Sequence, residues 1–181
     1  ALGLSVESWV AQEGTLSPGD AVWLTTALLE MLGGLRATTP HLLHGGISPA
    51  DVFITEEPRA LVLTGFAQAR RVVSQCLAPA QEGDPPFVEC VDATFAPPEM
   101  RIGNHTGLAT DLYGVAAVAL YALTGEGPRA FSGRMNELED VLVTGFRAPR
   151  LLARFLAGAL SPTVELRFQD VDAALDVITG R

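Results

Sequence analysis

The sequence contains no lysine, because all 12 of its basic residues are arginine. This absence excludes chemistry that depends on a lysine: a Walker A phosphate loop, a Schiff base with a carbonyl substrate, and a Ser-x-x-Lys acyl enzyme. The 21 acidic residues outnumber the arginines and give a formal net charge of −9. Nucleic acids and anionic membranes bind basic surfaces, so we expect neither as a partner.

Cysteine is scarce, with only Cys76 and Cys90 in the chain. Two cysteines do not make a disulfide framework, which favours a cytoplasmic location, either for this protein or for the cytoplasmic part of a larger one. Whether the two thiols pair with each other stays open at this point. The longest apolar run, Leu112–Leu123, is shorter than the roughly 20 residues that cross a bilayer, so no membrane insertion is expected.

The apolar content, by contrast, is sufficient for one core. The chain has 181 residues, 48% of them hydrophobic, which predicts a single domain over residues 1–181 that folds without disulfides or metal. Ser17 at an N-cap position, followed by Pro18, predicts the start of a helix. The pair Gly33-Gly34 predicts that this helix ends near residue 35.

Two short runs of β-forming residues, Val52–Thr55 and Leu61–Thr64, flank a turn at residues 56–59 and predict a hairpin. From Gly65 to Pro98 no helical or strand period holds. An irregular segment of that length is uncommon inside a compact domain and is often functional. We therefore expect residues 65–98 to form a long loop that can order on a partner.

Helical patterns return at Asp111, which stands where an N-cap residue would. Leu112–Leu123, which follows, is apolar on every side, and such a helix is buried all round. Three further helices are predicted at about 136–144, 148–159 and 169–178. Together these elements predict a mainly α-helical domain with one small β-hairpin.

Six short motifs stand out, at residues 44–54, 63–70, 97–99, 111–114, 123–131 and 161–167. In that order along the chain they resemble the C-terminal lobe of eukaryotic-type protein kinases. Residues 44–54 (His-Gly-Gly-Ile-Ser-Pro-Ala-Asp-Val-Phe-Ile) resemble the catalytic loop and the strand after it. Residues 63–70 (Leu-Thr-Gly-Phe-Ala-Gln-Ala-Arg) resemble the Asp-Phe-Gly segment. Further resemblances, to the Ala-Pro-Glu motif, the start and exit of the central helix and a late arginine turn, lie at residues 97–99, 111–114, 123–131 and 161–167.

The resemblance implies that the phosphotransfer groups are missing. In protein kinases one aspartate accepts the hydroxyl proton, while a second aspartate and an asparagine hold magnesium. Gly46 stands at the first aspartate and Gly65 at the second. Ser48 stands where the family has a loop lysine, and Asp51 where it has the asparagine. Because glycine offers neither a proton acceptor nor a metal ligand, we expect no catalytic residues, no metal and no cofactor, and no binding of ATP.

Residues with structural roles in the family are present. The resemblance pairs Glu99 with Arg167 in a buried salt bridge between the activation segment and the helical lobe. It implies that Asp111 accepts backbone N–H groups from the catalytic loop, and that His44 packs beneath that loop. A chain that keeps these residues and lacks the catalytic groups resembles a pseudokinase.

The start of the chain, Leu4–Val10, resembles the short helix just after the hinge between a kinase's two lobes, so the N-lobe is expected to be absent. A lobe of this kind resembles the kinase non-catalytic C-lobe domains, which bind other proteins. We therefore expect an inactive protein-binding, scaffold or regulatory module in signalling. Its partner surface is expected where an N-lobe would cover the lobe, because an uncovered apolar floor favours a partner; the residues are Gly45, Gly46, Ser48, Gly65 and Phe66.

Two alternatives remain open from the sequence. The chain is a C-lobe fragment of a larger pseudokinase or receptor cytoplasmic domain, or it is a non-kinase enzyme that uses a nucleotide on the same scaffold. His41 and His44 share a helical spacing. No cysteine or acid stands at ligand spacing beside them, so we expect no metal site there.

Overall fold

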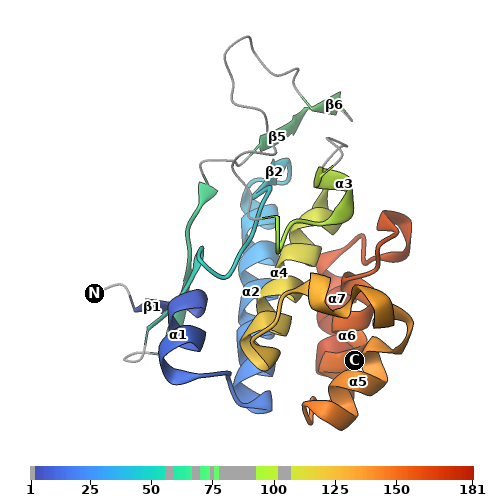
Figure 1. The fold of residues 1–181 in the computed structure, drawn as a ribbon. Coiled ribbons are helices and arrows are strands. Elements are labelled where there is room, and N and C mark those ends of the chain that lie inside the picture. The colour runs from blue at the N-terminus through green and yellow to red at the C-terminus, as the bar shows by residue number, and fades with distance from the viewer. Residues whose placement is uncertain (1–2, 56–58, 67–69, 74–75, 78–92, 102–106) are drawn as a thin grey trace.

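The structure is a computed structural model that describes residues 3–55, 59–66, 70–73, 76–77, 93–101 and 107–181. These residues form a mainly helical fold with two small antiparallel sheets (Figure 1). The elements are β1 (Leu4–Ser5), α1 (Val6–Glu13), α2 (Pro18–Thr38), β2 (Leu42–Leu43), β3 (Val52–Thr55), β4 (Ala60–Leu63), β5 (Arg70–Val73), β6 (Cys76–Leu77), α3 (Pro98–Arg101), α4 (Leu108–Thr124), the 3-10 helix η3 (Pro128–Glu137), α5 (Leu138–Gly145), α6 (Arg150–Ala159), the 3-10 helix η4 (Val164–Leu166) and α7 (Val171–Thr179).

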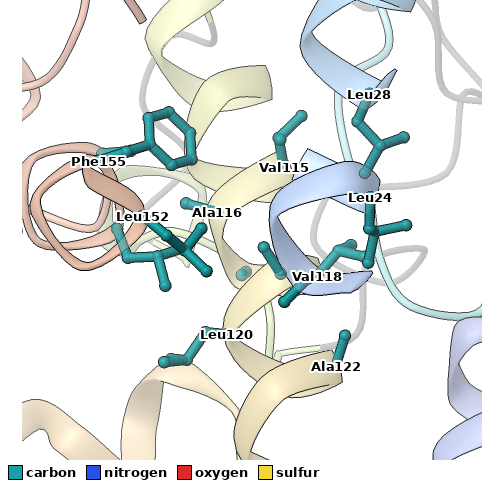
Figure 2. Packing of buried hydrophobic residues seen from close by; sticks show 14 of the residues in the cluster. Leu24, Leu28, Val115, Ala116, Val118, Leu120, Ala122, Leu152 and Phe155 are labelled. Atoms are coloured by element: carbon teal, nitrogen blue, oxygen red, sulfur yellow. The ribbon is translucent and has the colours of Figure 1, made fainter. Parts of the chain in front are cut away.

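Helix α4 is the centre of the fold, as its apolar sequence predicted. Every residue from Ala109 to Leu120 is buried. Helix α2 packs against one side of α4 and α6 against another. Figure 2 shows Phe155 of α6 on one side of this helix and Leu24 and Leu28 of α2 on the other. Each large side chain buried in this way contributes roughly 1.5–3 kcal/mol, so α4 accounts for much of the core's stability.

The start of α4 differs from the prediction. Gly107 is the N-cap and the helix begins at Leu108, which puts Asp111 inside the first turn. Thr110 provides the capping contact, because its Oγ1 accepts the N–H of Gly107 at 3.2 Å. The carboxylate of Asp111 does not cap its own helix and contacts the neighbouring loop.

Helix α2 begins as predicted but ends later. Ser17 is its N-cap, and the side-chain oxygen accepts a backbone N–H of the first turn. The helix passes through Gly33-Gly34 and beyond the predicted end near residue 35, and it continues to Thr38. A β-carbon at Gly33 would lie 3.6 Å from Val171 Cγ1 of α7. Packing against α7 therefore outweighs the low helix propensity of two glycines.

The predicted hairpin is confirmed. Strands β3 and β4 pair antiparallel, from Val52 opposite Leu63 to Thr55 opposite Ala60. Strand β1 adds to the free side of β3, with Leu4 opposite Ile54. Residues 56–58 of the predicted turn lie outside the described residues.

The segment from Gly65 to Pro98 is less irregular than predicted. It contains β5 and β6, and β5 pairs antiparallel with β2, placing Arg71 opposite Leu42. Because this pairing joins residues far apart in the sequence, no local hydrophobic pattern predicts it. Residues 78–92, including Cys90, lie outside the described residues. The question whether Cys76 and Cys90 pair therefore also lies outside them.

The last three predicted helices are confirmed as α5, α6 and α7, with ends within a few residues of the expected ones. Helix η3, which begins at Pro128, was not predicted. No helix in the described part of the chain is, taken singly, long and apolar enough to cross a membrane. Helix α4 and the segment Pro128–Gly145 have the length and composition of a membrane span only when they are taken as a pair, and a bend of 96° separates them.

The close approach of α4 to the loop at Ile47 generates a test. A β-carbon at Gly114 would lie 2.8 Å from Ile47 Cβ and 3.0 Å from its carbonyl oxygen. Gly114→Ala is therefore expected to lower the free energy of unfolding by about 1–3 kcal/mol. Gly34→Ala in α2 is the matched control, because nothing lies within 4 Å of its added β-carbon.

The control should be neutral or stabilising by up to about 1 kcal/mol, since alanine favours a helix over glycine. Urea unfolding of the two variants and the parent measures both effects. A Gly114→Ala protein as stable as the control would contradict the close packing of α4 on the loop.

Candidate functional site

The loop at residues 44–51 is held to α4 by the side chain of Asp111. Its Oδ2 accepts the N–H of His44 and its Oδ1 accepts the N–H of Gly45, each at 2.9 Å. Gly45 has a φ of 80°, in the left-handed region that favours glycine. These contacts confirm the role that the resemblance implied for Asp111.

Burial raises the pKa of Asp111 above its ordinary value of 3.8. Only 2% of the residue is exposed, and removal from water penalises the charged carboxylate. The two backbone N–H bonds act in the opposite direction and lower the pKa, but by less than burial raises it. Burial of the carboxylate that fixes the loop therefore disfavours its charged form.

His44 packs beneath the loop, as the resemblance implied, and is 1% exposed. Its Nε2 lies 2.6 Å from the carbonyl oxygen of Thr64, which assigns the ring proton to Nε2. The centroid of its ring lies 4.7 Å from the ring centroid of Phe66. Nδ1 has no hydrogen-bond partner among the described residues. Those residues also contain no group of three or more His, Cys, Asp or Glu side chains placed to hold a metal.

Asp51 is bonded into the turn of its own loop. Its Oδ2 accepts the N–H of Ser48 at 3.0 Å and the hydroxyl of Ser48 at 2.6 Å. Its carbonyl oxygen accepts the N–H of Thr64 at 2.9 Å and the Thr64 hydroxyl at 3.1 Å. Asp51 therefore ties the loop both to itself and to the end of β4.

The space beside Gly65 is filled by the Asp51 carboxylate. A β-carbon added at Gly65 would collide with Asp51 Oδ1, and it would lie 2.7 Å from Asp51 Cγ and 3.3 Å from His44 Cε1. Gly65 also has a φ of 84°, where other L-residues are strained. An aspartate does not fit at this position unless Asp51 moves.

The predicted partner surface is partly open. Gly65 and Phe66 are exposed, Gly46 and Ser48 are half-buried, and Gly45 is buried. Residues 44–54 and 63–66 contain a single carboxylate, that of Asp51. Binding of a partner at this surface stays a prediction.

The buried pair of Glu99 and Arg167 is confirmed. Arg167 Nη1 donates to Glu99 Oε1 at 2.7 Å and Nη2 donates to Oε2 at 2.8 Å, a bidentate geometry. Only 3% of Arg167 and 7% of Glu99 are exposed. The pair connects α3 with the segment after α6.

Sequence reasoning missed the further partners of this pair. Thr110 donates its hydroxyl to Glu99 Oε1 at 3.2 Å, and the Ser161 carbonyl accepts from Arg167 Nε at 2.7 Å. The Arg167 guanidinium lies 4.8 Å from the Tyr113 ring centroid. In the sequence, these partners are marked only by their places: Thr110 and Tyr113 lie beside Asp111, and Ser161 lies in the late arginine turn.

Comparison with known proteins identifies the fold. Serine/threonine-protein kinase F of Synechocystis sp. is 28% identical over 178 residues, which are 98% of this chain and 34% of that protein. Serine/threonine-protein kinase B of the same organism is 23% identical over 183 residues, 97% of this chain and 30% of that protein. The chain spans about a third of the length of these curated relatives. No protein-family model matches it.

Solved kinase domains match nearly the whole chain in three dimensions. The Mycobacterium tuberculosis PknI kinase domain gives a TM-score of 0.63 at 19% identity, covering 99% of this chain and 62% of that one. The Rad53 kinase domain gives a TM-score of 0.68 at 17% identity, covering 96% of this chain and 64% of that one. The chain has a protein kinase-like fold. It corresponds to the C-lobe, so the expected fold class is confirmed. The contacts described above therefore belong to a kinase-like lobe.

Removing one partner of the buried ion pair tests its role in the kinase-like lobe. Glu99→Ala leaves the Arg167 charge buried without a partner, and should lower the free energy of unfolding by about 3–5 kcal/mol. Arg59→Ala is the control, because Arg59 pairs with Asp20 at 2.6 Å on the surface and its side chain is 48% exposed. Arg59 also lies over the Trp23 ring, 3.9 Å from its centroid, so losing both surface contacts should cost about 2 kcal/mol or less.

Chemical unfolding of both variants gives the comparison, and the double variant Glu99→Leu/Arg167→Met should recover part of the loss. Similar costs for Glu99→Ala and Arg59→Ala would show that the buried pair does not hold α3 in place.

The raised pKa of Asp111 predicts a pH dependence. The folded state binds a proton on Asp111 more readily than the unfolded state, so stability falls as the pH rises from 3.8 through the raised pKa. Asp111→Asn does not titrate. The stability of the parent relative to Asp111→Asn should therefore be greater near pH 4 than at pH 7, measured by urea unfolding. A relative stability that increases toward pH 7 would contradict the assigned shift.

Proposed function

We propose that this kinase-like lobe is a cytoplasmic protein-binding, scaffold or regulatory module in signalling that performs no phosphotransfer. The single observation that supports it most is the filled space at Gly65. In protein kinases this position carries an aspartate that holds magnesium. Here the carboxylate of Asp51 lies where any side chain at residue 65 would begin. Gly46, at the position of the proton-accepting aspartate, offers no acceptor.

The bonds of Asp51 support the same conclusion. One of its oxygens already accepts two hydrogen bonds from Ser48, and the other faces Gly65. Protein kinases hold two magnesium ions with two separate side chains, an aspartate and an asparagine. A single carboxylate engaged in its own turn leaves too few ligands for that arrangement.

A binding role is supported by what the lobe retains. Asp111 fixes the backbone of the loop at residues 44–51. The Glu99–Arg167 pair fixes α3 to the segment after α6. The surface around the loop therefore keeps a defined shape without the catalytic groups. Phe66 is 39% exposed beside it, which adds a large apolar group for a partner to cover.

A second candidate is a lobe within a longer kinase-like protein. The observation that favours it is the coverage of the curated relatives, of which the chain spans 30–34%. The named activity of those relatives is serine/threonine-protein kinase, and in a longer protein it would depend on other segments. The experiment that tests the first proposal also measures this alternative.

The test uses the full gene product, purified from its source and sized by mass spectrometry. Incubation with radiolabelled ATP and Mg²⁺ or Mn²⁺, with a general protein substrate, should transfer no phosphate above the protein-free blank. In the same preparation, at least one co-purifying protein should be lost when Phe66 is changed in Phe66→Asp.

Two results would contradict the proposal. Phosphate transfer that disappears in a folded Asp51→Ala variant would show that the lobe catalyses it. An identical set of co-purifying proteins with and without Phe66→Asp would remove the predicted surface from partner binding. A product much longer than this chain, without transfer, would select the second candidate.

A further inference from the structure

A pocket of about 260 Å³ lies beside the Glu99–Arg167 pair. Residues from α3, α4, η3 and the segment after α6 line it, among them Pro98, Tyr113, Arg129, Met135, Leu160 and Pro162. Most of these side chains are apolar. Tyr113 and Leu160 are 4% and 1% exposed, so they form its floor, while Arg129 and Pro162 are exposed at its rim.

The buried ion pair holds the walls of this pocket together. Glu99 directly follows Pro98 in α3, and it binds Arg167 through two hydrogen bonds. The Arg167 Nη2 also lies 3.5 Å from the carbonyl oxygen of Pro162, and its guanidinium covers the Tyr113 ring. Three walls are thus fixed by one buried side chain, and a pocket formed in advance loses little entropy when a ligand enters.

Arg129 gives the rim its chemical character. It is the one charged residue that lines the pocket, and it makes no salt bridge within the described part of the chain. A guanidinium binds a carboxylate with two parallel hydrogen bonds, which selects for position as well as for charge. The rim therefore favours a carboxylate next to whatever fills the apolar interior.

We propose that this pocket binds an acidic peptide segment of a partner protein, with one large apolar side chain inserted and an adjacent carboxylate on Arg129. This docking site rests on the proposed function and names the chemistry of the partner. Its volume lies below the roughly 300 Å³ at which pockets for whole small molecules begin, which fits a single anchoring side chain.

The net charge of −9 limits how acidic the segment is. The field of the whole chain repels a polyanion, but charges separated by more than about 8 Å are largely screened at physiological ionic strength. A single carboxylate beside the anchor gains the contact with Arg129 at little long-range cost. The favoured segment therefore carries one or two acids rather than an acidic run.

The test screens the full-length protein against a displayed library of random heptapeptides. The enriched peptides should share a large apolar residue with Asp or Glu one or two positions away. Fluorescence anisotropy then measures their affinity for the parent and three variants. Arg129→Ala should weaken binding at least tenfold, and Ser132→Trp, which fills the rim from an exposed position, should abolish it.

Arg134→Ala is the matched control, because Arg134 is also an exposed arginine of η3 but does not line the pocket. It should change the affinity by less than twofold. No enrichment, peptides without an acid beside the anchor, or equal effects of Arg129→Ala and Arg134→Ala would overturn the docking site. Self-association that Ser132→Trp removes would replace the peptide with a second copy of the chain.

Failure here is distinguishable from failure of the proposed function. Arg129, Ser132 and Arg134 lie outside the loop at residues 44–51, so their substitution does not alter the phosphotransfer measurement. Circular dichroism of the Ser132→Trp variant checks its fold, and Arg129→Ala supplies an independent readout if that fold changes.

Discussion

The burial of α4 on every side is the constraint on which the rest of the structure depends. Because water does not reach its first turns, each polar group there needs a partner inside the protein. Asp111 binds the loop backbone, and Thr110 binds Glu99. Tyr113, one turn further, lies under Arg167. One stretch of helix thereby positions the loop, the buried ion pair and the floor of the pocket.

These contacts explain how a kinase-like lobe keeps its shape without catalytic groups, as proposed. The two best-buried carboxylates, Asp111 and Glu99, bind the backbone and an arginine of the lobe itself. Asp51 is directed at Ser48 and occupies the space beside Gly65. None of the hydrogen bonds to these three carboxylates depends on a nucleotide or a metal, so their stabilising effect is independent of phosphotransfer.

The sequence predicted what depends on local pattern and on motif order. The apolar circle of Leu112–Leu123 predicted the core helix, and the Glu99–Arg167 pair followed from the family resemblance. The end of α2 lies beyond the predicted one because the packing of α2 against α7 is a tertiary effect. The pairing of β5 with β2, the collision at Gly65 and the pocket at Arg129 all join distant segments, which no local period encodes.

A double-mutant cycle between Gly65→Asp and Asp51→Ala, with unfolding measured in the presence and absence of Mg²⁺, tests most directly whether the metal position is closed. The backbone strain at residue 65 is common to both backgrounds and cancels in the cycle. Gly65→Asp, and the uncharged Gly65→Ala that excludes repulsion between two carboxylates, should each cost at least about 1 kcal/mol more when Asp51 is present, and Mg²⁺ should change nothing. Equal costs in both backgrounds, with Mg²⁺ stabilising the Gly65→Asp protein, would contradict the closed site.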